Sequence, residues 1–142
     1  MITKTFQLGV RSKTMLIGVH PDLVKVVNLA ITKTTNDFVV GEGLRTMAKQ
    51  KEYVRTGASK TLKGRHVAEN NQCQLSCAVD LWALNDLDND GDLDINWVMK
   101  NYQPIATAMK AAARELGIPI EWGFDLWGWD APHFQLPKRL YP

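Results

Sequence analysis

Histidine is scarce in this chain of 142 residues, and two of its three histidines stand where a loop meets a predicted strand. His66 ends the loop "ASKTLKGRH", and His133 opens the short apolar segment "HFQLP". Asp80 lies within the apolar strand "CAVDLWAL", where a carboxylate needs a cation or a hydrogen-bond donor to offset its loss of hydration. A catalytic zinc ion commonly takes three ligands from His, Asp or Glu, and these three residues would supply such a set.

Plainer interpretations stay open for each of these residue types. A lone histidine is more often structural than a ligand, and His20, which precedes Pro21, is expected to cap a helix. Cys73 and Cys77 have the spacing C-x3-C without a second pair, which is a weak zinc signal. In a cytosolic chain we expect free thiols rather than a disulfide, although either sulfur could compete as a ligand.

Hydrolysis at a zinc site needs a carboxylate that moves protons. A zinc ion lowers the pKa of a bound water toward ~7 and polarises a carbonyl. Asp130, three residues before His133 in a Trp-rich turn, is placed to take that proton, and Asp125 in "WGFD" is a rival. Three tryptophans nearby could wall a groove for sugar or peptide, or pack in the core: Trp122, Trp127 and Trp129.

The segment "DLDNDGDLDINW" at 86–97 has half of a calcium-loop pattern. Its carboxylates stand at positions one, three, five and nine: Asp86, Asp88, Asp90 and Asp94. Gly91 fits position six, but position twelve is Trp97 instead of the Glu that closes the motif. The alternative is a solvated turn, although like charges this dense would repel one another without a cation.

Periodicity and breakers predict the elements that must position these residues. Helices are expected over 20–34, over 44–57 and from near Pro104 to Leu116, with the inward residues Ile105, Ala108, Met109, Ala112 and Leu116. Strands are expected at 38–40, 77–84, 118–123 and 133–137. This order favours an α+β fold with a small, mainly antiparallel sheet packed with helices, in one domain spanning 1–142.

The bulk composition excludes several classes of protein. The chain is 45% hydrophobic and 23% charged, which is ordinary for a globular domain. No apolar run approaches the ~20 residues of a membrane helix, and "MITKTFQLGVRSK" lacks the apolar region of a secretory signal. Outside the Asp-rich segment the balance is basic, which would favour an anionic polymer such as nucleic acid or cell wall, or serve solubility alone.

Several ordered segments resemble a known family. They are "VVGEGLRT" at 39–46, "GASKTLKGRH" at 57–66, "AVDL" at 78–81, "MKAAARELGIPIEWG" at 109–123 and "DAPHFQLP" at 130–137. Together they resemble the L-alanyl-D-glutamate peptidases of bacteriophage endolysins, relatives of the zinc D-Ala-D-Ala carboxypeptidases. The resemblance covers most of the chain and implies a D-Ala-D-Ala carboxypeptidase/hedgehog-like fold.

The resemblance also assigns roles to residues. It places the zinc ligands on His66, Asp80 and His133, and the proton-handling acid on Asp130. The arginine of "GLRT", Arg45, would bind a carboxylate of the acidic stem peptide, as a guanidinium does well, or form a structural salt bridge. Two further residues would line the same groove: Ser59 and Lys60.

The chain departs from the family pattern S-x-H-x-x-G-x-A-x-D between two of these ligands. Gly64 and Ser76 replace the serine and the glycine, and 13 residues separate His66 from Asp80 where six are usual. Lengthening a surface loop costs little, because closure entropy rises by only ~0.6 kcal/mol per doubling. The ligands are therefore expected still to converge, although the insertion could bring Cys73, Cys77 or Glu69 near the metal.

The function implied is zinc-dependent hydrolysis of the L-Ala–D-Glu amide bond of peptidoglycan, causing host lysis. Such a protein would wait in the host cytoplasm until a membrane pore releases it to the wall or periplasm. We expect peptidoglycan as its partner, no nucleic acid, no stable membrane association and a monomer, with Zn²⁺ as cofactor and Ca²⁺ as a second candidate. The alternatives are a D,D-carboxypeptidase and a non-catalytic, calcium-dependent module that binds the cell wall.

Overall fold

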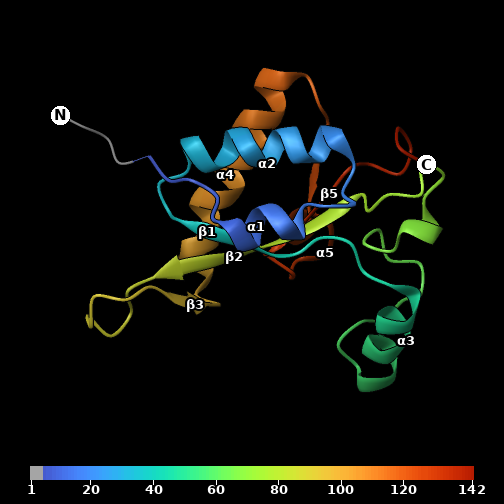
Figure 1. The fold of residues 1–142 in the computed structure, drawn as a ribbon, viewed down its shortest axis with the longest axis horizontal. Helices are drawn as coiled ribbons and strands as arrows, with labels where there is room; N and C mark the ends of the chain where they lie inside the picture. Colours follow the sequence, from blue (N-terminus) through green and yellow to red (C-terminus); the bar gives the residue numbers. More distant parts are fainter. Residues whose placement is uncertain (1–4) are drawn as a thin grey trace.

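The computed structural model describes residues 5–142 of the chain (Figure 1). Its α-helices are α1 (Val10–Met15), α2 (Pro21–Lys33), α3 (Met47–Thr56), α4 (Met99–Leu116) and α5 (Gly123–Trp127), with one short 3-10 helix over Ala68–Asn70. Its strands are β1 (Phe38–Glu42), β2 (Ala78–Asn85), β3 (Asp94–Asn96), β4 (Glu121–Trp122) and β5 (His133–Gln135). No helix among the described residues is long and apolar enough to span a bilayer.

The strands form one antiparallel sheet around the long strand β2. The order is β1-β2-β5-β4, and β3 pairs with the far end of β2. In the β2–β5 ladder Asp80 is the partner of His133 and Val79 the partner of Phe134. Because side chains alternate between the two faces of a strand, Val79 and Phe134 enter the core while Asp80 and His133 share the other face.

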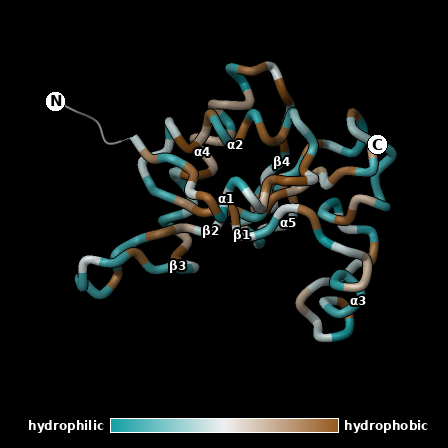
Figure 2. Tube along the Cα trace, viewed as in Figure 1, coloured by the Kyte–Doolittle hydropathy of each residue, from teal (hydrophilic) through white to brown (hydrophobic). Residues whose placement is uncertain are grey.

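The hydrophobic core lies between the sheet and two long helices. α2 and α4 pack against each other on one side of the sheet (Figures 1 and 2). Their inward residues include Leu23, Val27, Ile105 and Met109, all fully buried. Burying each such side chain contributes roughly 1.5–3 kcal/mol, so this layer fixes the strand β2 from which the site is built.

The structure confirms the α+β class with a small antiparallel sheet and changes several boundaries. The sequence predicts that this helix begins near Pro104. In the structure α4 begins at Met99, so Pro104 lies inside the helix. The Asn96 side chain accepts a hydrogen bond from the Val98 N–H and so organises the earlier start. Leu116, predicted inward, is 40% exposed beside the helix end at Gly117. α1, β3 and α5 were not predicted, because each is too short to show a periodic pattern.

The lengthened segment 67–76 folds into an ordered turn around one buried amide. The Asn71 side chain donates hydrogen bonds to the carbonyls of Arg65, Val67 and Leu75. The Arg65 guanidinium bonds the Asn71 side chain and the Leu136 carbonyl. The insertion therefore closes on itself, and His66 and the start of β2 are held as if the loop were short.

Candidate metal centre

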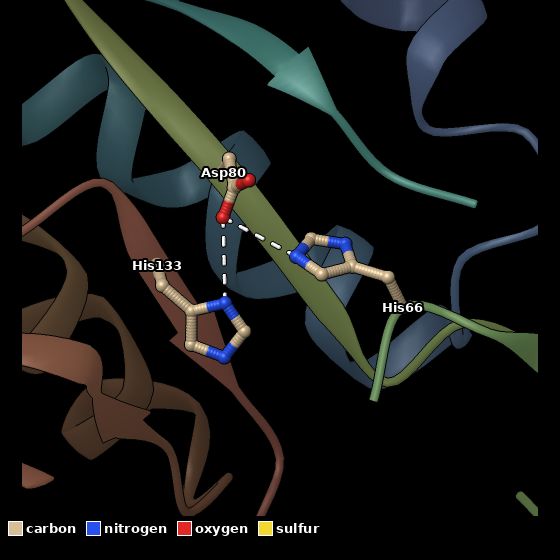
Figure 3. Close-up of side chains that lie close together, drawn as sticks. All are labelled: His66, Asp80 and His133. Atoms are coloured by element: carbon tan, nitrogen blue, oxygen red, sulfur yellow. Dashed lines mark hydrogen bonds and ion pairs between the residues drawn. The ribbon is translucent and has the colours of Figure 1, made fainter. Parts of the chain in front are cut away.

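Three side chains from distant parts of the chain meet at one point (Figure 3). Asp80 Oδ1 lies 3.2 Å from His66 Nε2 and 3.3 Å from His133 Nδ1. The β2–β5 register places Asp80 opposite His133. His66 lies on a loop, and the Arg45 N–H fixes the backbone of that loop by donating a hydrogen bond to the His66 carbonyl at 3.0 Å. These are the three residues that the sequence predicts as zinc ligands.

The hydrogen bonds behind the two rings leave three acceptor atoms facing one another. His66 Nδ1 lies 2.8 Å from the Gly43 carbonyl, which only accepts, so this nitrogen donates and Nε2 offers its lone pair. His133 Nε2 lies 2.8 Å from the Gln135 side-chain oxygen, so Nδ1 offers its lone pair. Two lone pairs and a carboxylate oxygen need a cation between them, and a metal ion fits this donor set.

The charges of the site act on one another through little water. In the metal-free site, burial alone would raise the pKa of Asp80, but the facing rings of His66 and His133, when protonated, hold it well below its ordinary value. Burial alone would lower the pKa of His133, but the hydrogen bond that its protonated ring donates to Asp80 raises it above its ordinary value. The carboxylate is thus kept ionised and ready to bind a cation.

Asp130 borders this group on the turn before β5. Its backbone has a φ of +62°, an uncommon conformation for a residue with a side chain. Gly123 makes the turn possible, because a Cβ there would lie 2.5 Å from the Asp130 carbonyl oxygen. Burial and the nearby charge of Asp80 raise the pKa of Asp130, against the opposing effect of His133. A carboxylate with a raised pKa is a better proton acceptor, as the predicted role requires.

Arg45 lies beside the site, and most of its donors are already bonded within the protein. Its guanidinium makes two hydrogen bonds to Glu42, of 2.9 and 2.8 Å, and a third of 2.7 Å to Gln50. It also lies 3.8 Å from Asp80 Oδ2. The fully buried Gln50 donates in turn to Ser59 Oγ at 2.9 Å, so the two residues predicted to bind substrate belong to one network.

Sequence reasoning missed three polar residues that support the site: Glu42, Gln50 and Gln135. Each is buried although its residue type is usually exposed. Glu42 stands in the predicted strand segment "VVGEG", and Gln135 lies two residues from His133 on the same strand face. A polar residue in an apolar strand was the signal that identified Asp80, and the same signal applies to Glu42 and Gln135.

The tryptophans divide between core and surface. Trp122 is buried and stacks on Phe134, with ring centroids 6.2 Å apart. Trp127 and Trp129 are half exposed, and the Trp127 ring centroid lies 5.3 Å from that of His133. The Lys60 ammonium lies 5.6 Å from the centroid of the Trp129 ring. Trp127 thus lies against one residue of the metal group, and Trp129 and Lys60 continue outward from Trp127.

The competing ligands do not join the metal group. Within residues 5–142 that group contains only the two histidines and Asp80. Cys73 and Cys77 are free thiols with their sulfurs 3.9 Å apart, and burial raises the pKa of Cys77 to about 11. Asp125 is exposed and pairs with Lys110 at 2.6 Å. The His20 ring accepts the Asp22 N–H at the start of α2, as expected for a cap.

The predicted calcium ligands also lie together, three in the loop between β2 and β3 and one at the start of β3. Their carboxylates can approach one another within 4.8 Å: Asp86, Asp88, Asp90 and Asp94. The loop is largely hydrophilic and exposed (Figure 2). The two Asp86 oxygens accept the backbone N–H groups of Asp90 and Gly91, at 3.1 and 3.0 Å. Calcium binding stays a prediction, because exposed acidic groups often gather without an ion.

A buried His-Asp-His group with a raised-pKa carboxylate beside it defines a candidate metallohydrolase. The chain belongs to the phage L-alanyl-D-glutamate peptidase family, which residues 4–136 match. It is 28% identical to the L-alanyl-D-glutamate peptidase of Escherichia phage T5, over 96% of this chain and 93% of that protein. It also resembles the crystal structure of the Serratia marcescens L-Ala D-Glu endopeptidase ChiX, with 42% identity, a TM-score of 0.81 and coverage of 98% and 96%.

Proposed function

We propose that the protein is a zinc-dependent endopeptidase that hydrolyses the L-Ala–D-Glu amide bond of peptidoglycan stem peptides. The observation that carries the proposal is the convergence of two histidine lone pairs on one Asp80 oxygen, beside Asp130. The choice of bond rests on the family, whose members carry the name L-alanyl-D-glutamate peptidase. The choice of zinc rests on the donor atoms, because histidine nitrogens and a carboxylate oxygen are ligands that suit zinc.

The ligands of the zinc ion would be His66 Nε2, Asp80 Oδ1 and His133 Nδ1. An ion bound there supplies a Lewis acid for the scissile carbonyl and lowers the pKa of water at the site. The buried carbonyl of Gly43 and the amide of Gln135 keep both rings in the orientation that binding requires. This positioning by hydrogen bonds lowers the entropy cost of assembling the site.

Asp130 would move the proton. Its carboxylate takes a proton from the attacking water and passes it to the departing amine of D-Glu, which leaves as a neutral group. The raised pKa of Asp130 makes its carboxylate a stronger proton acceptor than an ordinary aspartate. The left-handed backbone of residue 130 directs this side chain, and such strain is often found at functional sites.

The acidic stem peptide would bind on the side of the site that Arg45 and Ser59 border. Arg45 keeps its charge, since the facing carboxylates of Glu42 and Asp80 raise its pKa against the effect of burial. Three of its N–H groups donate hydrogen bonds inside the protein. We therefore propose that Arg45 attracts the substrate carboxylate mainly through its charge, at long range, and does not bind it in a bidentate pair. Lys60 is exposed and able to donate directly, whereas the Ser59 hydroxyl accepts from Gln50 and donates to the Thr61 carbonyl at 3.3 Å.

The biological role that follows is lysis of a bacterial host by a phage. The protein would act as a single monomeric domain on peptidoglycan, after a membrane pore releases it from the cytoplasm. Outside the loop between β2 and β3 its charge is basic, which favours adsorption to an anionic wall. Neither nucleic acid nor a stable membrane association is part of this proposal.

Mass spectrometry of muropeptides from purified wall tests the proposal. We expect new D-Glu amino termini, which disappear with a zinc chelator and return with added zinc. Release of free D-Ala instead would indicate a D,D-carboxypeptidase. Adsorption to the wall without any released peptide would indicate a binding module. Asp130→Asn is the matched control, because it keeps the three ligands and removes the proton acceptor.

A further inference from the structure

Behind His133 lies a row of polar side chains that the reaction itself does not require. Asp80, His133, Gln135 and Glu121 follow one another on the same face of three adjacent strands. Asp80 is the β2 partner of His133, and Glu121 is the β4 partner of Gln135. His133 and Gln135 are two residues apart on β5, so their side chains point the same way. The sheet register alone therefore aligns the four side chains.

The chemistry of this row allows only one direction for its hydrogen bonds. Gln135 Nε2 lies 3.0 Å from Glu121 Oε1, and a carboxylate oxygen accepts. The Gln135 amide must therefore turn its nitrogen toward Glu121 and its oxygen toward His133. That oxygen lies 2.8 Å from His133 Nε2, which must then carry a proton and donate it. His133 Nδ1 is left with a lone pair directed at Asp80 Oδ1.

We propose that Glu121 and Gln135 are positioning residues that fix the tautomer of His133 and thereby select Nδ1 as its metal-binding atom. A neutral histidine in water can carry its proton on either nitrogen, and the wrong tautomer would place an N–H against the metal. Gln135 prevents this, and Glu121 prevents Gln135 from turning over. His66 has a simpler arrangement, because a backbone carbonyl, Gly43 O, has no second orientation.

This inference rests on the metal site proposed above, but its main test does not require metal or activity. Nitrogen NMR of the metal-free protein, at a pH where His133 is neutral, reports which ring nitrogen carries the proton. We expect Nε2–H in the unmutated protein. In Gln135→Leu the constraint is gone, and we expect a mixture of the two tautomers. A pure Nε2–H signal in Gln135→Leu would overturn the proposal.

Metal affinity, measured by competition with a chelator of known zinc affinity, gives a second readout. Loss of a partner behind a ligand typically weakens metal binding about 10–100-fold, and we expect this for Gln135→Leu. Glu121→Gln should weaken binding less, since the new amide can still accept from Gln135 in one of its orientations. Unchanged affinity in Gln135→Leu would contradict the positioning role. Melting curves of the metal-free variants show whether each one folds.

An exchange of the two residues separates positioning from simple packing. Gln135→Glu alone keeps an acceptor for the His133 N–H but places two carboxylates face to face, so we expect the Nε2–H tautomer to persist and the zinc affinity to fall. In the double variant Glu121→Gln/Gln135→Glu, the new amide donates to the new carboxylate, whose other oxygen accepts from His133. We expect the exchange to keep Nε2–H and to restore most of the zinc affinity. Failure of the double variant to improve on Gln135→Glu would refute the assignment. If these results hold while muropeptide release fails, the positioning proposal survives and the proposed function does not.

Discussion

Two groups of metal-capable side chains lie at opposite ends of β2, and they are built in different ways. The His66–Asp80–His133 group is mostly buried, and hydrogen bonds from behind hold both rings. The group of four aspartates follows the end of β2 on an exposed loop. There the carboxylates are held mainly by N–H groups of the loop itself.

The difference shows what makes a site ready for its ion. In the first group folding has already removed water from the side chains, and the protonated rings of His66 and His133 hold Asp80 ionised. In the second group like charges oppose one another: lost hydration and the charges of Asp88 and Asp90 raise the pKa of Asp94. The first group is thus fixed before a metal arrives, whereas the second would depend on the ion for its order.

Removal of a ligand gives the largest expected effect. His133→Ala and Asp80→Ala each leave two ligands, too few for a stable tetrahedral zinc site. We expect loss of stoichiometric zinc and of wall-hydrolysing activity, measured by metal analysis and by turbidity of purified wall. The matched change at the other group, Asp88→Asn with Asp90→Asn, should leave both measurements as they are. Full activity in either alanine variant would remove the first group from the mechanism.

Asp130→Asn should leave zinc in place and lower kcat by about 10²–10⁴-fold, the usual contribution of a general base. Asp125→Asn is the control, because Asp125 is an exposed carboxylate on the same Trp-rich segment and pairs only with Lys110 among the interactions seen for it. Steady-state kinetics on a soluble stem peptide, with zinc content measured in parallel, checks this prediction. Equal losses in the two variants would mean that Asp130 has no special role.

Gly123→Ala tests whether the backbone of residue 130 must lie where it does. The added Cβ would meet the Asp130 carbonyl at 2.5 Å and the His133 Cβ at 3.0 Å, so the turn has to move. Misplacement of reacting groups by ~1 Å can cost ~10²-fold in rate, and we expect a loss of roughly 10–100-fold. Gly9→Ala is the control, since a Cβ at Gly9 meets nothing within 4 Å. Unchanged kinetics would show that the turn tolerates a shift.

The contrast between the groups also explains what the sequence could predict. Asp80 was recognisable because a carboxylate in an apolar strand needs a partner, and the β strands themselves were visible as apolar runs. Gln135 carried the same signal as Asp80, a polar residue in an apolar strand, but its partner Glu121 lies on another strand that only the folded chain brings beside it. Gln50 gave no such signal, because its helix is polar and its partner Ser59 lies beyond the end of that helix. The ordered insertion 67–76 was equally hidden, since its organisation depends on the single buried amide of Asn71.

The pH dependence of stability in the metal-free protein gives a smaller, signed effect. The pKa of Asp80 is lowered by folding, so its contribution is present above about 3.9 and is lost as the pH falls. The pKa of His133 is raised, so its contribution is present below about 6.5 and is lost as the pH rises through the raised value.

Urea unfolding in the presence of a chelator, compared between the unmutated protein and Asp80→Asn, measures this contribution. We expect a difference of roughly 1.5–3 kcal/mol between about pH 4 and 6.5, which shrinks at higher pH. With zinc bound the high-pH decrease should vanish, since the metal takes the place of the proton. A difference that is constant across the pH range would show that Asp80 stabilises the fold without its charge.

The smallest effect is expected at the aspartate loop. Replacing one of its carboxylates by a neutral amide should change the free energy of unfolding little and should raise it, whereas the change at Asp80 lowers it. Asp88→Asn keeps the oxygen that accepts the Asp90 N–H at 3.3 Å, and it removes one charge that repels Asp94. Without calcium we expect the free energy of unfolding to rise by no more than about 0.5 kcal/mol, as for an ordinary surface change. If the loop binds calcium, added calcium raises the melting temperature of the unmutated protein, and Asp88→Asn loses part of that rise. Identical melting curves with calcium and with a calcium-specific chelator would leave the loop as a solvated turn, and metal binding would then belong to the buried group alone.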